Sequence, residues 1–290
     1  MGKTISNKTQ GILWVLSAAF FFAAMNMFVK LAGDVPFVQK SFFRNIVAAI
    51  IALIMVIRTE EKTKLTKTNV FDLFMRSVFG TLGILCNFYA VDHINISDAS
   101  LLNKLSPFYA VILSMFILKE KANKSDWMFL VIAFIGALFV IKPTFDFRSF
   151  PAFMGLLGGM MAGTAYTFLR KVGLSGVKGP IIVLFFSTCS CTLVLPYLLF
   201  NYSPMTKYQL TMLIMAGCSA ALAQISITAA YTKVPAKEIS VFDFSQILFA
   251  AILGALFLDQ LPDRYSIIGY IIIIVTAVAR WKYMLNHSEN

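Results

Sequence analysis

Long apolar segments alternate with short polar ones along the whole chain. Ten of them are predicted to be membrane-crossing helices, because a crossing helix needs roughly 20 largely apolar residues. Several are shorter than this between their nearest charges, so the flanking charged residues are expected to snorkel or to face a wet interior. The ten segments are Ile12–Val29, Asn45–Ile57, Ser77–Val91, Leu105–Leu118, Trp127–Ile141, Ala152–Leu169, Gly179–Phe200, Tyr208–Ala230, Ile239–Leu258 and Tyr265–Ala279.

The second half of the chain repeats the pattern of the first. Aligning Asp98–Val140 with Glu238–Arg280 without a gap places LLNKLSPFYAVILSMFILKE over VFDFSQILFAAILGALFLDQ. We therefore expect two domains, residues 1–145 and 146–290, with five spans each. An odd number of spans makes the second domain enter the membrane from the opposite side. The predicted fold is an all-α integral membrane protein of ten transmembrane helices, arranged as two inverted five-helix repeats.

Composition excludes a soluble globular protein and charge predicts the orientation in the membrane. The chain is 59% hydrophobic and only 13% charged, which leaves too little polar surface to cover a soluble fold. Most of the 25 Lys and Arg residues fall on one side of the ten spans, so both termini are predicted to be cytoplasmic. This bias accounts for the net charge of +11 without a nucleic-acid partner. We expect a bacterial inner (plasma) membrane.

Polar residues inside the apolar segments are the strongest functional signal, because each is costly in hydrocarbon unless it faces protein or water. One face of the fourth predicted helix carries a small and polar stripe, and the ninth carries its counterpart: Asn103, Ser106, Ala110 and Ser114 match Asp243, Gln246, Ala250 and Gly254. We expect these two polar stripes to face each other or a common cavity. Helix–helix hydrogen bonding without a substrate is the alternative interpretation.

Charged residues within the spans suggest what such a cavity would hold. Asp243 must pair with a cation, accept hydrogen bonds or take up a proton. It is therefore either a site for a substrate ammonium group or a proton, or the partner of Lys104, Arg76 or Lys237 in a structural ion pair. Arg44 and Lys104 are candidates for attracting the anionic end of a solute.

Three further residues complete the candidate site. Asn26 and Tyr166 occupy matching positions of the two halves. Pro107 is expected to kink the fourth helix and to free a backbone carbonyl, and a gating role for it is a hypothesis. The predicted substrate-binding residues are Asn26, Arg44, Asn103, Lys104, Ser106, Tyr166, Asp243 and Gln246.

Two long segments carry a family resemblance. FYAVDHINISDASLLNKLSPFYAVILSMFILKEK in the first half and AAYTKVPAKEISVFDFSQILFAAILGALFLDQLPDRYSIIGYIIIIV in the second each resemble the EamA domain of the drug/metabolite transporter superfamily. The resemblance covers essentially the whole chain. It implies ten helices, both termini inside, and carriage of small metabolites such as amino acids, nucleosides or their derivatives. SDASLLNKLSP and FDFSQILFAAILG are similar to a branch that includes carriers of S-adenosylmethionine and riboflavin. Family members commonly have Glu where Gln260 stands here.

The predicted function is secondary transport of a small organic metabolite by alternating access. An intramembrane enzyme and a channel subunit are the alternatives. The only histidines are His93 and His287, and no HExxH, GxSxG or P-loop pattern occurs, so we expect no catalytic residues, cofactor or metal. The expected partners are the metabolite and membrane lipid, with a coupling proton or counter-substrate left open and no nucleic acid. The chain is expected to be a monomer or homodimer.

Overall fold

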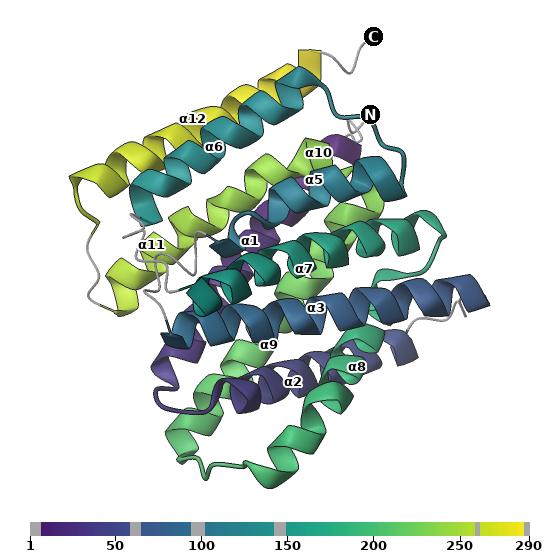
Figure 1. The fold of residues 1–290 in the computed structure, drawn as a ribbon, viewed down its shortest axis with the longest axis vertical. Coiled ribbons are helices and arrows are strands. Elements are labelled where there is room, and N and C mark those ends of the chain that lie inside the picture. The colour runs from purple at the N-terminus through teal and green to yellow at the C-terminus, as the bar shows by residue number, and fades with distance from the viewer. Residues whose placement is uncertain (1–6, 59–64, 94–101, 142–148, 259–261, 287–290) are drawn as a thin grey trace.

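The computed structural model describes residues 7–58, 65–93, 102–141, 149–258 and 262–286, and within these ranges all regular structure is helical (Figure 1). The helices are α1 (Asn7–Leu31), α2 (Phe37–Arg58), α3 (Lys67–His93), α5 (Ser106–Ile117), α6 (Lys124–Ile141), α7 (Ser149–Leu174), α8 (Gly179–Phe200), α9 (Lys207–Lys233), α10 (Ala236–Ile239), the 3-10 helix η1 (Ser240–Phe244), α11 (Ser245–Phe257) and α12 (Arg264–Asn286).

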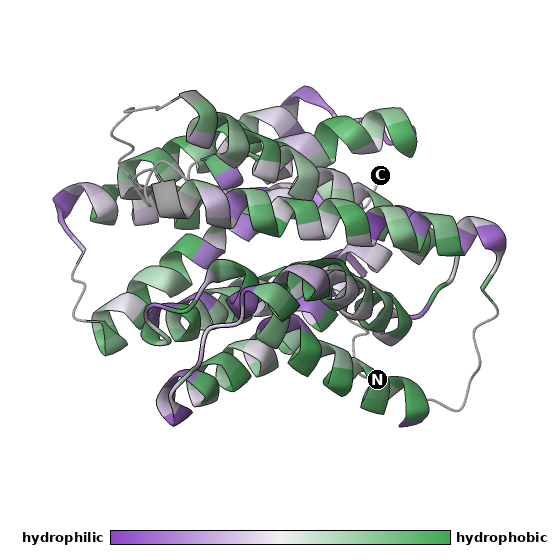
Figure 2. Cartoon of the chain, turned by 60° about the horizontal axis from the view of Figure 1, so that its bottom comes forward, coloured by the Kyte–Doolittle hydropathy of each residue, from purple (hydrophilic) through white to green (hydrophobic). Residues whose placement is uncertain are grey.

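The length and composition of these helices fit a membrane-spanning bundle. Eight spans among the described residues are long and apolar enough to cross a membrane, one of them formed by α10, η1 and α11 together. Figure 2 shows the colours of hydrophobic residues along most of the length of the helices. With that interrupted span counted once, the described residues form ten helical spans, which confirms an all-helical membrane protein. The inverted relation of the halves stays a prediction, and the expected boundary at 145/146 lies outside the described residues.

Two of the helices begin well before the apolar segments that predicted them. Helix α2 starts at Phe37, although the apolar segment starts at Asn45, and α3 starts at Lys67 rather than Ser77. The extra turns contain Arg44 and Arg76, whose side chains are buried in the bundle. Charge therefore does not mark the ends of these helices, because both arginines face protein rather than lipid.

Helices from the two halves pack against each other throughout the bundle. The closest pairings are α3 with α7, α1 with α9, α2 with α8, and α6 with α12 (Figure 1). Glycines bring the backbones together at these crossings. A methyl group at Gly83 of α3 would lie 3.1 Å from the backbone nitrogen of Ala162, and one at Gly158 of α7 would lie 3.0 Å from that of Asn87. Small residues allow this approach, since lipid supplies no hydrophobic drive for helix association.

The fourth and ninth spans are both interrupted near the middle of the bundle. A turn at Lys104 and Leu105 precedes α5, and Pro107 stands in the first turn of that helix. Proline lacks an N–H, and the first turn has no intrahelical use for one. The interruption therefore lies before Pro107 rather than at a kink within the helix. In the ninth span, the 3-10 turn η1 carries Asp243.

Local sequence signals account for several helix ends. Thr206 and Gln209 form a reciprocal capping box at the start of α9, which satisfies two backbone donors. Helix α1 is followed by Gly33 at a φ of 65°, and α7 by Gly176 at a φ of 82°. Both are left-handed conformations that favour glycine and end a helix cleanly.

The crossing of α5 and α7 provides a stability test. A methyl group at Gly163 would lie 2.7 Å from the carbonyl oxygen of Ser106 and 2.9 Å from the backbone nitrogen of Ala110. We expect Gly163→Ala to lower the free energy of unfolding by about 1–3 kcal/mol, because the two backbones must move apart. Thermal unfolding in detergent measures this. Gly179→Ala is the matched control, since its methyl group would meet only Thr228 Cγ2 at 3.6 Å. An equal effect of the two substitutions would contradict the tight crossing.

Candidate functional site

A polar cavity lies in the middle of the bundle, where the interrupted spans meet α1, α2, α3, α7, α8 and α9. Its volume is about 150 Å³. Side chains from both halves of the chain line it: Phe22, Met25, Asn26, Arg44, Arg76, Gly80, Gly83, Ile84, Asn87, Asn103, Lys104, Ser106, Ala162, Ala165, Tyr166, Phe186, Gln224, Asp243 and Gln246. Broken helices at membrane depth are tolerated where they line such a cavity.

An ion pair between the two halves forms one wall of the cavity. Lys104 Nζ lies 3.3 Å from Asp243 Oδ2 and donates to Gln246 Oε1 at 2.8 Å. The side chains of Lys104 and Asp243 are only 11% and 12% exposed. The turn before α5 and the 3-10 turn η1 bring these groups face to face. The buried ammonium thereby compensates the buried carboxylate.

Arg76 of α3 is held in a fixed position on the cavity wall. Its guanidinium carbon lies 4.2 Å from the ring centroid of Phe186, and its Nη2 donates to Gln224 Oε1 at 3.1 Å. Gly80, one turn further along α3, leaves the room that the guanidinium occupies, because a methyl group there would collide with Arg76 Nη1. Nε of Arg76 is buried without a hydrogen-bond partner.

Arg44 of α2 is also buried against the cavity, with 4% of its surface exposed. Hydrogen bonds made by other residues of α2 hold this helix in place. Asn45 Nδ2 donates to Ser190 Oγ of α8 at 2.8 Å, and Gln39 exchanges two hydrogen bonds with the backbone of Ser203. Among the described residues Arg44 has no hydrogen bond or ion pair, and its Nε is buried unsatisfied.

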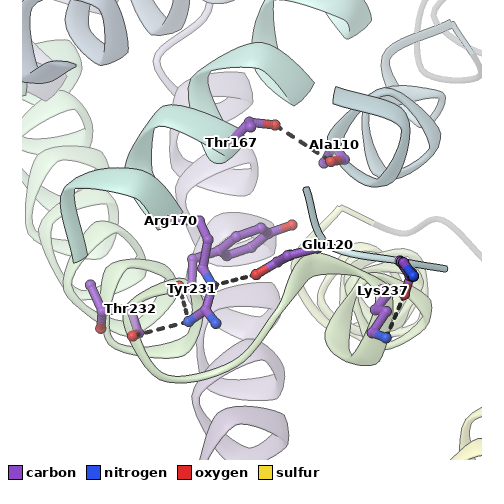
Figure 3. Close-up of polar contacts among 8 residues, drawn as sticks. Ala110, Glu120, Thr167, Arg170, Tyr231, Thr232 and Lys237 are labelled. Atoms are coloured by element: carbon purple, nitrogen blue, oxygen red, sulfur yellow. Dashed lines mark hydrogen bonds and ion pairs between the residues drawn. The ribbon is translucent and has the colours of Figure 1, made fainter. Parts of the chain in front are cut away.

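Two stacked tyrosines, of which Tyr166 lines the cavity, and an arginine lie toward one end of the bundle. The rings of Tyr166 and Tyr231 are 5.0 Å apart at an interplanar angle of 20°. One turn along α7 from Tyr166, Arg170 Nε donates to Glu120 Oε1 at 3.1 Å, and its Nη1 donates to the carbonyl oxygens of Tyr231 and Thr232 (Figure 3). The guanidinium thus caps the carboxyl end of α9 and joins it to the segment after α5.

Ion pairs between the halves gather at this same end. Arg280 Nη2 lies 2.7 Å from Asp126 Oδ1 and also donates to the carbonyl oxygen of Lys237, while Lys171 Nζ lies 2.9 Å from Asp72 Oδ1. Further cross-half contacts there join Lys8 to Glu238, Lys233 to Gln10 and Lys237 to the carbonyl oxygen of Lys121. Helix α1 begins and α12 ends at this end, which we call the charged end.

The structure brings the eight predicted substrate-binding residues to one cavity. Asn26, Arg44, Asn103, Lys104, Ser106, Tyr166, Asp243 and Gln246 all contribute to its lining. Their role in binding a substrate stays a prediction, as does gating by Pro107. Of the three ion-pair partners considered for Asp243, the structure selects Lys104. Arg76 bonds to Gln224 instead, and Lys237 bonds to the carbonyl oxygen of Lys121.

The polar stripes are only partly directed at the cavity. Further along α5, Ala110 packs against α7, where its carbonyl oxygen accepts from Thr167 Oγ1 at 3.4 Å (Figure 3). Its counterpart Ala250 in α11 is exposed on the outside of the bundle. Only the first two residues of each stripe, Asn103 with Ser106 and Asp243 with Gln246, line the cavity.

Sequence reasoning did not select three cavity residues: Arg76, Asn87 and Gln224. Each is a polar residue in an otherwise apolar span, the same signal that identified Asn103 and Asp243. Applying it to the third and eighth spans would have found all three. The aligned repeat segments cover the fourth and ninth spans but not the third and eighth.

Comparison with known proteins identifies a transporter family over nearly the whole chain. The sequence model of the EamA-like transporter family matches residues 9–142 and again residues 149–279. The resemblance found in the sequence is thereby confirmed. A solved crystal structure with 12% sequence identity has a TM-score of 0.82 and covers 97% of this chain and 99% of its own. At that identity, the likeness concerns the fold alone.

Named relatives are membrane transporters. The pseudopaline exporter CntI of Pseudomonas aeruginosa is 31% identical over 93% of this chain and 95% of its own length. An S-adenosylmethionine uptake transporter of Rickettsia prowazekii is 23% identical over 94% of this chain and 93% of its own. An uncharacterised transporter of Helicobacter pylori is 27% identical over 92% of this chain and 93% of its own. These names indicate small-molecule transport rather than catalysis.

The interaction energy between Lys104 and Asp243 can be measured from the free energies of unfolding of single and double variants. We expect Asp243→Asn and Lys104→Gln each to lower the free energy of unfolding by about 3 kcal/mol, because each leaves one buried charge without its partner. The double variant should recover most of the loss, because it removes both charges. Unfolding in detergent of the four proteins gives the coupling energy. Additive losses would show that the pair does not compensate the buried charges.

Proposed function

The chain belongs to the EamA-like transporter family, and we propose that it is a secondary carrier that moves a small organic metabolite across a membrane by alternating access. The main observation that supports this proposal is the polar cavity. Residues of both family-matched segments line it, and charged contacts between those segments lie to one side of it. A site between two related halves is the arrangement in which many secondary carriers bind their solute.

We further propose that the halves are inverted repeats. Exchanging the halves maps the α3–α7 pair onto α9–α1, the α5–α7 pair onto α11–α1, and the α2–α9 pair onto α8–α3, while α2–α8 and α6–α12 map onto themselves. Every one of these pairs is closely packed. Such a pattern is expected of a pseudo-two-fold axis, and five spans per half place that axis in the membrane plane.

The charged end would be the closed side of the carrier in this conformation. Cavity residues of α1 and α2, such as Asn26 and Arg44, lie in the helix halves away from the charged end. To expose the cavity to the other side, the contacts of Arg170, Lys171 and Arg280 across the halves must break. Alternating access then corresponds to the exchange of these contacts for others at the opposite end.

The positive-inside rule places the charged end, with both termini, in the cytoplasm, and a bacterial inner membrane is the proposed location. Amino acids, nucleosides and their derivatives are the proposed solutes.

The described residues also disfavour the two alternative functions, an intramembrane enzyme and a channel subunit. A hydrolytic enzyme would need a nucleophile and base, or a metal, and no group of three His, Cys, Asp or Glu side chains suited to a metal occurs among the described residues. A channel would need a polar path past the Tyr166–Tyr231 stack and Arg170.

Exchange in liposomes tests the proposed function. Purified protein is reconstituted with an unlabelled metabolite mixture inside and labelled amino acids or nucleosides outside. Counterflow requires no assumption about direction, which matters because one named relative is an exporter and another an uptake transporter. We expect accumulation of at least one labelled solute above protein-free liposomes. Absence of exchange across a broad panel, with folded protein in the bilayer, would argue against a carrier.

Asp243→Asn tests whether the cavity is the transport site. We expect it to lower the initial exchange rate per folded protein by about tenfold or more, because a charge-assisted contact in the cavity is lost. Asp34→Asn is the matched control, since Asp34 is exposed between α1 and α2. Equal rates for the two variants would remove Asp243 from the transport site.

Glu120→Gln tests the closed side. The substitution weakens the contact with Arg170, whose side chain is 9% exposed, and we expect the cavity to become accessible from the charged end about tenfold more often. A single cysteine at Ala165, which lines the cavity, in a background without native cysteines, reports this as faster labelling by a polar thiol reagent added to that side. Glu238→Gln is the control, because its partner Lys8 is 40% exposed and screened by solvent. Equal labelling rates for the two variants would contradict a closing role for Glu120.

A further inference from the structure

The cavity carries more positive charge than the protein compensates. Among the described lining residues there are three cations, Arg44, Arg76 and Lys104, and one carboxylate, Asp243. The carboxylate is paired with Lys104 at 3.3 Å. Within the part of the chain that the structure describes, the two guanidinium groups therefore have no anionic partner.

Both arginines are too deeply buried to be treated as solvated surface charges. Arg44 and Arg76 are 4% and 3% exposed, and each has a buried Nε without a hydrogen-bond partner. A buried charge that is not paired costs several kcal/mol, and a guanidinium cannot shed its proton to avoid that cost. The fold keeps two such groups at the wall of a cavity, where a ligand can reach them.

The surroundings of Arg76 indicate a group held ready for an anion. The Phe186 ring supports one face of the guanidinium, Gln224 accepts from Nη2, and Nη1 packs in the space left by the missing side chain of Gly80. None of these neighbours supplies negative charge. A guanidinium fixed in this way presents a rigid fork, which matches the two oxygens of a carboxylate or phosphate group.

Another part of the cavity lining offers a different chemistry. Lys104, Asp243 and Gln246 form a connected set that is close to neutral and contains both donors and acceptors. This set suits a hydroxyl, amide or amine group on the body of a solute. A cavity volume of about 150 Å³ restricts that body to a compact molecule. The first half thus supplies the uncompensated charge, and the second half supplies Asp243 and Gln246.

We propose that the cavity binds a compact organic dianion, whose two negative charges compensate Arg44 and Arg76. This inference rests on the proposed function and names the substrate class of that same site. A dicarboxylate and a phosphate monoester are two sources of the same charge. The sequence alone suggested one anionic and one cationic end. That assignment changes because Asp243 is already paired within the protein.

Ligand protection of the purified protein tests this inference. The probes are glutarate and glycerol 3-phosphate as the two kinds of dianion, butyrate as a monoanion and putrescine as a dication, all at matched ionic strength. Thermal unfolding in detergent reports binding, because a ligand that binds only the folded state raises the unfolding temperature. We expect at least one dianion to bind about tenfold or more tightly than butyrate, and putrescine to give no protection.

Substitution of the arginines ties the preference to the cavity. Arg44→Gln and Arg76→Gln should each weaken dianion binding by about ten- to a hundredfold while changing butyrate binding far less. Arg44→Lys and Arg76→Lys should retain the dianion preference at lower affinity, because they keep the charge and lose the fork. Arg58→Gln is the control on the same helix as Arg44, since Arg58 is exposed at the far end of α2. The ratio of dianion to monoanion affinity is unaffected by a general loss of stability.

Any of four results would overturn the inference. They are equal binding of butyrate and the dianions, preferential binding of putrescine, no protection by any dianion, and an unchanged ratio of dianion to butyrate affinity in both Gln variants. Counterflow in liposomes separates this failure from that of the proposed function. If only cations or neutral solutes are exchanged, the proposed dianion substrate is contradicted and the proposed carrier function is supported. If dianion binding responds to Arg44 and Arg76 but no solute is exchanged, the dianion site is supported and the carrier function is contradicted.

Discussion

Charge inside a membrane protein must face either protein or water, and this constraint organises the middle of the bundle. Arg44, Arg76, Lys104 and Asp243 come from four different helical spans, yet all four reach the same cavity. This arrangement keeps all four side chains away from lipid. The interruptions before α5 and within the ninth span follow from the same constraint. They turn the Lys104 and Asp243 side chains toward each other.

The contrast between the cavity and the charged end explains how one bundle can be stable and still change conformation. At the charged end, arginine and lysine side chains meet carboxylates or helix carbonyls across the halves, as Arg170 does with Glu120 and the end of α9. In the cavity, Arg44 and Arg76 have no such partner among the described residues. Ion pairs hold one side together, while the two guanidinium groups without an anionic partner leave the centre dependent on what enters it.

Close backbone contact is the second condition on which this arrangement depends. Gly83, Gly158 and Gly163 let α3 and α5 approach α7 until backbone atoms nearly touch. Larger residues would separate the helices and widen the cavity, which would move the arginines away from the rest of the lining. The glycines of the sixth span thus contribute to the site through packing, without contacting a solute themselves.

The sequence by itself determined the fold class, the number of spans and much of the cavity lining. Apolar periodicity and the internal repeat are local or pairwise signals, and polar residues in apolar spans can be recognised one at a time. The tertiary structure decided which charges compensate each other. Lys104, Arg76 and Lys237 were equivalent partners for Asp243 in the sequence, and only packing brought Lys104 within 3.3 Å. It also buried Arg44 near the start of α2 without an ion-pair partner among the described residues. Helix ends and side-chain partners depend on neighbouring helices that are distant in the sequence.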